Sequence, residues 1–450
     1  MTRVLKFGGS SLADAECLRA VAAIVAEALP QGPLVVLSAC GDTTDDLFAA
    51  AHAARAGDLA RALESMQALL ARHAAVARQL FGETLPGELG RALAQETEDL
   101  TGLLRGVALL RELSPRSMDA IAAHGERLST RLFASLLERE EFDVTWFDAR
   151  GVVVTDERFG QAQPDRARVG ERAKELLAPL LRPGRCVVTQ GYVGATHDGV
   201  TTTLGRGGSD YSAALLGAAL GVDEVQIWTD VEGVMTADPR VVEGALPIAE
   251  LSFAEAAELA LFGARVLHPA TIQPAVEAGL PVTVRHTRRP AGRFTTITGR
   301  VASGRPVTAL ATRGPISVLT VISSRMLAQP GFLARLFAVF GRHAVSVDLV
   351  ATAEVSVSLT VEADAPLDDL VKEIEEFARV DVANQRAIVA IVGERLKQTP
   401  GLAARIFEAL GAINVEMISM GANEINLSLV VAREHADEAL RRLHRTLFGR

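Results

Sequence analysis

The first residues that could do chemistry lie in the segment KFGGSS at residues 6–11, between a β-branched run and an Ala-rich helical pattern over residues 12–29. Two adjacent glycines let backbone N–H groups approach an anion, and Lys6 adds a full positive charge, so the turn suits a phosphate. The spacing is not that of a P-loop. Ser11 and Asp14 have the spacing of a capping box. A tight strand-to-helix turn with a surface lysine fits the same residues equally well.

A second glycine-rich segment, TTTLGRGGSD at residues 201–210, leads into an apolar helical pattern over residues 211–220 that Gly221 should end. Arg206 can hold a carboxylate through two parallel hydrogen bonds, and Asp210 can hold an ammonium group. Side by side, these charges suit the zwitterion of an amino acid. The competing interpretation is a structural glycine loop with a surface ion pair, which leaves most of these polar groups without a purpose.

Other polar residues lie beside expected strand ends, where α/β sheets bind ligands. Ser38 and Thr44 follow one strand, and the polar segment 228–240 begins at another and could line a nucleotide site. Glu126, taken singly, is a solvated helix charge, and Ser38 and Thr44 equally fit a simple loop. His268 suits a core histidine, and no cluster has the spacing of a metal site, so we expect no structural zinc.

The elements that must position these residues follow from the pattern of the chain. Short β-branched runs alternate with amphipathic Ala- and Leu-rich stretches over about the first 290 residues, which predicts a mainly parallel α/β sheet sandwiched by helices. The expected strands are residues 3–7, 34–37, 144–147, 186–189, 225–228 and 282–285. Residues 46–141 lack strand signals and predict a helical insertion that ends with a helix over 119–138. Ser252 and Glu255 form a capping box for another helix.

The C-terminal part of the chain repeats itself. Residues 318–361 align without gaps on residues 388–431, and Pro330 falls on Pro400. Each copy predicts a strand, a Pro-Gly turn, a helix (332–342 or 402–410) and two more strands, so it is a βαββ unit. The expected domains are an α/β domain over 1–295, a linker over 296–314 that is rich in Gly, Arg, Thr and Pro, and βαββ domains over 315–385 and 386–450.

Composition limits the class of protein. The chain has 450 residues, 49% hydrophobic and 22% charged, which excludes a disordered or fibrous protein. A formal net charge of −9 argues against binding to nucleic acid or an anionic membrane. Three cysteines without CxxC spacing, and the lack of a signal peptide or a membrane-spanning run, lead us to expect a soluble, cytoplasmic protein.

Several segments together resemble the aspartokinases of the amino-acid-kinase superfamily, and the likeness runs the length of the chain. Its C-terminal repeats resemble a tandem pair of ACT domains, and the segments 326–337 and 346–359 are closest to the monofunctional, lysine-inhibited type. A single glycine motif is shared with glutamate, acetylglutamate, carbamate and uridylate kinases, whereas the set is specific. The segments that carry the resemblance are KFGGSS (6–11), HGERLST (124–130), TTTLGRGGSDY (201–211), WTDVEGVMTADPR (228–240) and FGARVLHPA (262–270).

The resemblance implies that ATP, with Mg²⁺, phosphorylates the β-carboxylate of L-aspartate on the way to lysine, threonine and methionine. It assigns catalysis to Lys6, Asp210 and Arg206, with Arg206 on the α-carboxylate and Glu126 on the amine; no protein ligand of a metal is assigned. The implied aspartate-binding residues are Ser38, Thr44, Glu126, Tyr192, Thr203, Arg206 and Ser209. The implied ATP-binding residues are Lys6, Gly8, Gly9, Ser10, Thr229, Asp230, Met235, Arg240 and Arg265.

The resemblance also implies feedback inhibition through the ACT domains, by lysine or, as the second choice, threonine. The implied effector-binding residues are Met326, Gly331, Phe332, Leu333, Val347, Asp348, Thr352 and Glu354. Three residues depart from the family: Arg265 replaces a lysine, Met235 a tyrosine and Ala353 a serine. A lone βαββ unit has an open sheet edge and little core, so we expect at least a homodimer through the ACT sheets, with the effector at the interface.

Two other functions stay open at this point. One is a non-catalytic amino-acid sensor with a degenerate kinase domain, and the other is a sister kinase with another carboxylate substrate. The intact Lys6, Arg206 and Asp210 favour a kinase, because a sensor has no use for two phosphate-binding turns. A β-carboxylate is already ionised at neutral pH, so the reaction needs no general base and no histidine relay is expected.

Overall fold

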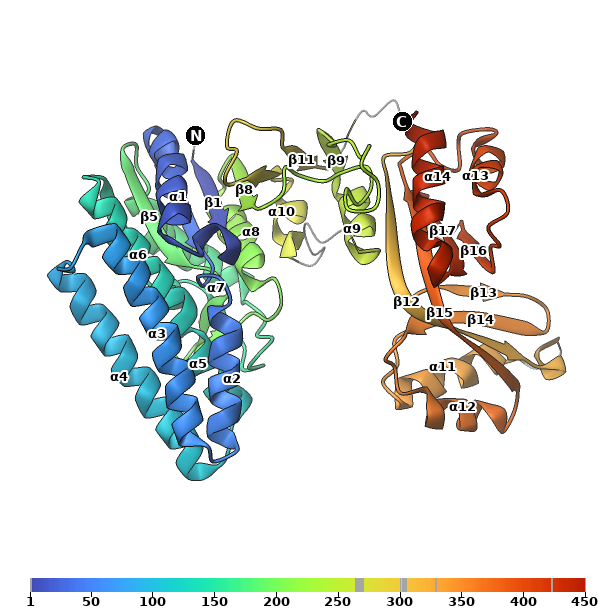
Figure 1. Cartoon of the computed structure of the whole chain (residues 1–450), viewed down its shortest axis with the longest axis horizontal. Helices are drawn as coiled ribbons and strands as arrows, with labels where there is room; N and C mark the ends of the chain where they lie inside the picture. Colours follow the sequence, from blue (N-terminus) through green and yellow to red (C-terminus); the bar gives the residue numbers. More distant parts are fainter. Residues whose placement is uncertain are drawn as a thin grey trace. The chain divides into compact units, whose positions relative to one another are not determined.

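The computed structural model describes residues 2–263, 271–299, 301, 306–327, 330–421 and 424–449. These residues belong to two compact units (Figure 1). The first unit comprises Met1–Val234 and Val266–Gly299, and the second comprises Met235–Arg265 and Arg300–Arg450.

The large sheet of the first unit is parallel except at one edge. Its strands lie in the order β3-β5-β2-β1-β8-β10-β11, and β11 is antiparallel to β10. All six expected strands are confirmed to within one residue at each end. Their bounds are Arg3–Phe7 (β1), Leu34–Leu37 (β2), Asp143–Phe147 (β3), Arg185–Gln190 (β5), Glu224–Thr229 (β8) and Val282–His286 (β10), followed by Thr295–Thr298 (β11).

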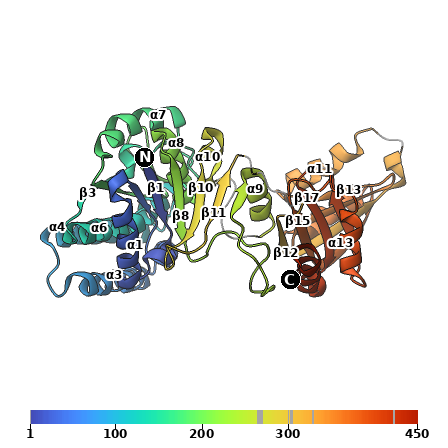
Figure 2. The same cartoon turned by 90° about the horizontal axis from the view of Figure 1, so that it is seen from above.

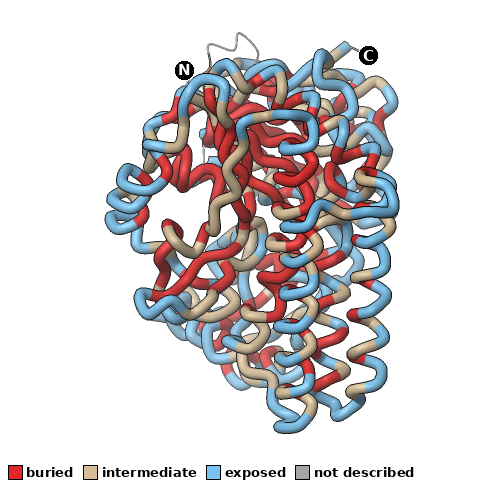
Figure 3. The backbone as a smooth tube through the Cα atoms, turned by 90° about the vertical axis from the view of Figure 1, so that its left-hand side faces the viewer, coloured by how far each residue is buried: buried red, intermediate tan, exposed pale blue. Residues whose placement is uncertain are grey.

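Helices cover both faces of this sheet (Figure 2). On one face α1 (Ala15–Ala28) and α6 (His124–Arg139) pack on side chains of β1 and β2, and α8 (Gly208–Leu220) and α10 (Gln273–Ala278) lie on the other. The strands are therefore runs of buried Val, Ile and Leu, as a parallel sheet between two helical layers requires. Figure 3 shows this as red strands inside helices whose outward faces are pale blue.

The helical insertion expected between the second and third strands is confirmed. It consists of α2 (Thr43–Arg55), α3 (Leu59–Phe81), α4 (Gly87–Leu110), α5 (Pro115–Ala122) and α6. The single helix expected over 119–138 was wrong, because α5 and α6 are separate. The first of them begins early, since Ser114 accepts a hydrogen bond from the N–H of Ser117 and Pro115 occupies the first turn.

The expected capping box at Ser11 was also wrong. Residues Gly9–Leu12 form a 3₁₀ turn, and α1 starts after Asp14, whose carboxylate accepts a hydrogen bond of 2.7 Å from the N–H of Cys17. The Ser11 hydroxyl is instead 2.7 Å from the hydroxyl of Thr287, which follows β10. The sequence pattern could not reveal this distant partner.

The remaining elements of the first unit are small. A three-stranded sheet joins β4 (Val154–Thr155), β6 (Val193–Thr196) and β7 (Thr201–Thr203), and α7 (Arg166–Arg172) lies between β4 and β5 in the chain. The expected helix after the second glycine-rich segment is α8. It begins three residues earlier than residue 211 and ends, as expected, before a left-handed Gly221.

The second unit contains one antiparallel sheet in the order β13-β14-β12-β15-β17-β16. The first strand of each repeat pairs with the first strand of the other, so the two βαββ units share a ladder. Both begin outside the expected limits of the repeats, β12 inside residues 296–314 and β15 before residue 386. The strands are Ala309–Ile322 (β12), Val350–Thr352 (β13), Ser356–Glu362 (β14), Arg379–Val392 (β15), Met417–Met420 (β16) and Asn426–Ala432 (β17).

The helices of the second unit include the two that the repeat predicted, with the same bounds. They are α11 (Phe332–Arg342) and α13 (Leu402–Leu410), with α12 (Leu367–Glu375) and α14 (Ala436–Phe448) completing the pair of units. The second unit also contains β9 (Glu250–Ser252) and α9 (Phe253–Leu261), where the expected capping box of Ser252 and Glu255 is present.

Among the described residues, no helix is long and apolar enough to cross a membrane. Cys17, Cys40 and Cys186 are free cysteines. The cytoplasmic location stays a prediction.

The packing of the helical insertion predicts the effect of two matched substitutions in α4. Leu104 is fully buried and Leu109 is 85% exposed. Leu104→Ala should lower the free energy of unfolding of the first unit by about 2–5 kcal/mol, and Leu109→Ala by less than about 0.5 kcal/mol. Both tryptophans lie in the first unit, so urea titration followed by tryptophan fluorescence measures this difference. Equal losses in the two variants would contradict the described packing of α4.

Candidate active site

The two glycine-rich segments meet in the first unit. The ammonium nitrogen of Lys6, in β1, lies 2.5 Å from a carboxylate oxygen of Asp210, in the first turn of α8. Their side chains are 11% and 17% exposed. Since Lys6 and Asp210 come from the two motifs that sequence analysis treated separately, the ion pair places both motifs at one site.

The turn after β1 is held close to the turn after β2. The N–H of Gly8 donates to the carbonyl of Trp228 over 3.3 Å, and the N–H of Gly41 donates to the carbonyl of Gly9 over 3.0 Å. A Cβ on Gly9 would lie 3.0 Å from the carbonyl oxygen of Gly41, so a side chain there would crowd the backbone of that turn. Ser10 is exposed. The first glycine-rich turn therefore keeps its backbone accessible beside Lys6.

Glu126 is buried at the start of α6, with 3% of its surface exposed. One carboxylate oxygen accepts a hydrogen bond from the N–H of Ala39 over 3.2 Å, and the other has no partner among the described residues. Burial raises the pKa of Glu126 to about 8, because a dry site disfavours the charged form. The expectation of a solvated charge was wrong, because α6 lies against the sheet rather than at the surface.

The segment that contains Ser38 is fastened to the same helix. The carbonyl of Ser38 accepts a hydrogen bond of 2.7 Å from the Ser129 hydroxyl, and a Cβ on Gly125 would lie 2.9 Å from the Cβ of Ala39. Ser38 is half-buried after β2, and Thr44 is half-buried in the first turn of α2. The turn after β2 therefore lies directly over the first turn of α6.

Thr203 is held by a residue that the sequence analysis missed. The N–H and the hydroxyl of Thr203 donate to the two carboxylate oxygens of Asp119, over 2.9 and 2.7 Å, and the N–H of Gly160 donates to the same carboxylate over 2.9 Å. Asp119 is 1% exposed and burial raises its pKa. The one sequence signal was its spacing of seven residues from Glu126, which in the single helix expected there would place both carboxylates on one face.

Tyr192 lies against the second glycine-rich loop. A Cβ on Gly208 would lie 2.7 Å from the Tyr192 ring, and Tyr192 itself has a left-handed backbone with φ of 66°. The pKa of Tyr192 is raised to about 12, mainly by burial and in smaller part by the charges of Glu126 and Asp119. The phenol is therefore within electrostatic reach of both buried carboxylates.

The other loop residues are placed as follows. Ser209 is buried against Gly191, whose Cβ would lie 2.6 Å from that of Ser209. Arg206 is exposed, and its guanidinium has no ion-pair partner among the described residues. The Thr229 carbonyl accepts from the N–H of Thr287 over 2.9 Å, and its hydroxyl donates to Asp230 over 3.0 Å. The ends of β8 and β10 are thereby joined beside the turn after β1.

Three expected ATP-binding residues are not among the described residues of the first unit. Met235 and Arg240 belong to the second unit, where Arg240 pairs with Asp238 over 2.7 Å. Arg265, like His268, lies outside the described residues. The geometry of the first unit therefore brings together Lys6, the glycines and Thr229, and leaves these nucleotide assignments as predictions.

The expected effector residues lie in the second unit. Asp348 pairs with Arg313 over 3.1 Å, and its second oxygen is buried without a partner among the described residues. Burial raises the pKa of Asp348, and Arg313 opposes that change. Gly331 adopts a left-handed conformation (φ 93°) before α11. Phe332 is buried, Met326 and Val347 are half-buried, and Leu333, Thr352 and Glu354 are exposed.

Within the described ranges, no group of three or more His, Cys, Asp or Glu side chains could hold a metal ion. Any divalent cation at Lys6 and Asp210 would therefore need ligands from a bound substrate or from water.

Comparisons with known proteins agree on one family. The model of the Amino acid kinase family matches residues 1–286, and the model of an ACT domain matches residues 389–447. Lysine-sensitive aspartokinase 3 of Escherichia coli is 40% identical over 453 residues, which cover 99% of each chain. Two crystal structures of E. coli aspartokinase III also match with TM-scores of 0.84 and 40% identity. The match to the complex with lysine and aspartate covers 99% of this chain and 99% of that chain. The match to the complex with aspartate and ADP covers 100% of both chains.

The buried Glu126 predicts a pH-dependent stability. The folded unit keeps the proton of Glu126 up to about pH 8, whereas an ordinary glutamate releases it near 4.5. Between these values the folded state binds more protons, so the free energy of unfolding should fall as pH rises. Glu126→Gln removes the titrating carboxyl group and with it this decrease in the free energy of unfolding.

The stabilisation of Glu126→Gln relative to the unsubstituted protein should therefore be larger at about pH 8 than at about pH 5. Urea unfolding followed by tryptophan fluorescence at both pH values measures it. A difference that does not change with pH would show that the carboxyl titrates normally.

Proposed function

The chain belongs to the aspartokinase family, and we propose that it transfers the γ-phosphoryl group of ATP to the β-carboxylate of L-aspartate, yielding 4-phospho-L-aspartate and ADP, under feedback inhibition by lysine. The observation that carries this proposal is the ion pair between Lys6 and Asp210. It joins the turn suited to a phosphate with the loop suited to an amino acid, and a phosphoryl transfer needs both at one place.

The chemistry requires positioning and charge neutralisation rather than proton removal. A β-carboxylate has a reference pKa near 4 and is already a nucleophile at neutral pH. The crowded negative charge of the phosphates needs cations and N–H donors placed in advance. Lys6 is such a cation, and the backbone after β1 supplies an N–H donor at Gly9, whereas the N–H of Gly8 already donates to the carbonyl of Trp228. Asp210 holds the Lys6 ammonium at the site until the phosphate takes its place.

Glu126 and Arg206 are the residues that hold the ends of aspartate. The unpartnered oxygen of Glu126 suits the α-ammonium, whose charge stabilises the ionised carboxylate and lowers its raised pKa. Arg206 has a free guanidinium for the α-carboxylate. Asp119 is a positioning residue, because it fixes Thr203 through two hydrogen bonds. Ser38, Thr44, Tyr192 and Ser209 complete the proposed aspartate site.

Mg²⁺ enters the proposal with the nucleotide. It neutralises phosphate oxygens and commonly keeps several waters, so it can bind without a group of protein carboxylates. Among the residues that the structure describes, no such group is present.

Lysine is the proposed effector, and the ACT pair is the proposed site. The buried, unpartnered oxygen of Asp348 suits an ammonium group, and the turn at Gly331 opens the N-terminus of α11 to a carboxylate. Inhibition follows if lysine binds one state of the enzyme better, which typically couples two sites by about 1–3 kcal/mol.

A homodimer through the ACT sheets is also part of the proposal. Pairing of β12 with β15 covers one edge of each repeat within the chain, and β13 and β16 remain as edges. Val350, Ile418 and Met420 on these strands are exposed apolar side chains. A second copy of the chain would cover them.

Formation of an acyl hydroxamate tests the function. With ATP, Mg²⁺, L-aspartate and hydroxylamine, the purified protein should form aspartyl hydroxamate and ADP in equal amounts, and lysine should suppress the reaction. Glutamate in place of aspartate should give much less product. If aspartate binds and an aspartokinase control is active but no hydroxamate forms, the protein is a sensor rather than a kinase.

Two substitutions separate the roles of the two loops. Lys6→Met should lower kcat by at least about 100-fold with little change in the KM for aspartate, because Lys6 acts on the transferred group. Arg206→Lys should raise the KM for aspartate about tenfold with little change in the KM for ATP, since the two-point grip on a carboxylate is lost. Steady-state kinetics with each substrate varied measures both. The reverse pattern would exchange the assigned roles.

A further inference from the structure

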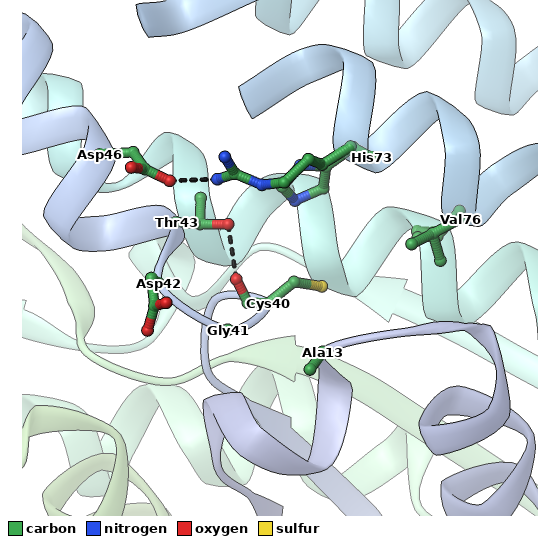
Figure 4. A pocket seen from close by; sticks show the side chains of 10 residues that line it. Ala13, Cys40, Gly41, Asp42, Thr43, Asp46, His73 and Val76 are labelled. Atoms are coloured by element: carbon green, nitrogen blue, oxygen red, sulfur yellow. Dashed lines mark hydrogen bonds and ion pairs between the residues drawn. The ribbon is translucent and has the colours of Figure 1, made fainter. Parts of the chain in front are cut away.

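A cavity of about 340 Å³ lies in the first unit, beside the turn after β2 (Figure 4). Neither Ser38 nor Glu126 lines it. Its wall comes from the start of α2, the middle of α3, one residue of α6 and the residue before Asp14. The lining residues are Ala13, Cys40, Gly41, Asp42, Thr43, Asp46, Arg72, His73, Val76 and Leu132.

His73, which lines this cavity, has an unpaired hydrogen-bond acceptor. The side chain is 6% exposed, and its Nδ1 lies 3.0 Å from the carbonyl oxygen of Leu69. A carbonyl oxygen only accepts, so Nδ1 carries the proton and Nε2 keeps its lone pair. Nε2 is buried and has no partner among the described residues. Burial lowers the pKa of His73, which keeps the ring neutral and Nε2 an acceptor.

The other unpaired groups of the cavity are acceptors too. Asp42 is exposed at the rim, and no ion pair or side-chain hydrogen bond of its carboxylate occurs in the described part of the chain. Asp46 forms an ion pair with Arg72, and the Thr43 hydroxyl donates to the Cys40 carbonyl over 2.6 Å. Arg72 is thus the one cation of the wall, and its charge is matched by Asp46. The wall keeps a net charge of −1 from Asp42.

The remaining wall is apolar. Ala13, Val76 and Leu132 contribute hydrocarbon surface, and burial raises the pKa of the Cys40 thiol to about 12, so the thiol is neutral. A complementary ligand therefore offers hydrogen-bond donors and positive charge, together with a short aliphatic body.

We propose that this cavity binds a small aliphatic amine in its ammonium form. One ammonium hydrogen bonds to Nε2 of His73, the carboxylate of Asp42 balances the charge, and the methylene groups pack on Ala13, Val76 and Leu132. None of the residues assigned above to aspartate or the nucleotide lines this cavity, and the proposal does not depend on those assignments.

Calorimetric titration of the full chain tests the proposal, with 1,4-diaminobutane as the probe. The diamine should bind, and the uncharged 1,4-butanediol and the anionic succinate should bind at least about tenfold more weakly, because neither offers a positive charge to Asp42. No heat of binding at about 10 mM diamine, or equally tight binding of the diol or of succinate, would overturn the proposal.

Matched substitutions locate the binding. Asp42→Asn and His73→Asn should each weaken diamine binding about tenfold; asparagine in place of His73 keeps a donor for the Leu69 carbonyl and removes Nε2. Asp45→Asn and His52→Asn, the same changes at exposed positions of α2 outside the cavity, should leave the affinity unchanged.

A filled cavity provides the last test. Val76→Phe should abolish diamine binding while circular dichroism shows an intact fold. Unchanged affinity in Asp42→Asn, His73→Asn and Val76→Phe would place the amine elsewhere and overturn the proposal. These titrations contain neither ATP nor aspartate, so their outcome is independent of the hydroxamate assay.

Discussion

The arrangement of the catalytic unit depends on one ion pair, between Lys6 and Asp210. Both side chains are largely removed from water, and either charge without the other would be costly there. The pair therefore fixes the distance between the end of β1 and the start of α8, two elements about 200 residues apart in the chain. It also holds the Lys6 ammonium group at a place where, in the proposed reaction, a phosphate oxygen can replace the Asp210 carboxylate as its partner. Under the proposed function, a stabilising contact of the substrate-free protein would thus hold Lys6 ready for the phosphoryl group.

The parallel sheet explains why distant residues converge on that pair. The carboxyl ends of β1, β2 and β8 lie at one edge, and each continues into a loop that carries polar groups. Helices α5 and α6 add buried carboxylates. Glu126 accepts a hydrogen bond from the turn after β2, and Asp119 accepts one from the end of β7. Burial raises the pKa of both acids, and that of Glu126 to about 8, so the cationic amine of the proposed substrate would change the charge of Glu126 as well as its contacts.

Much of this could be predicted from the sequence, for a physical reason. A strand buried on both faces is a run of β-branched residues, so the six parallel strands were found almost to the residue, and gapless repetition placed α11 and α13. The contacts of polar residues whose partners lie far away in the chain could not be predicted. Ser11 caps no helix because its hydroxyl meets Thr287, and Glu126 is buried because α6 lies against the sheet. Asp119 escaped notice because no local pattern marks a carboxylate that fixes a remote loop.

The shared ladder of β12 and β15 makes the regulatory half indivisible. Each strand is 14 residues long, and each completes the sheet of the other repeat. Deleting one repeat would leave a long row of backbone N–H and C=O groups on the other repeat without partners. Such an exposed edge promotes association with other extended chains. Gene fusions or truncations that respect this sheet must therefore keep or discard the two repeats together, although their sequences look like separable modules.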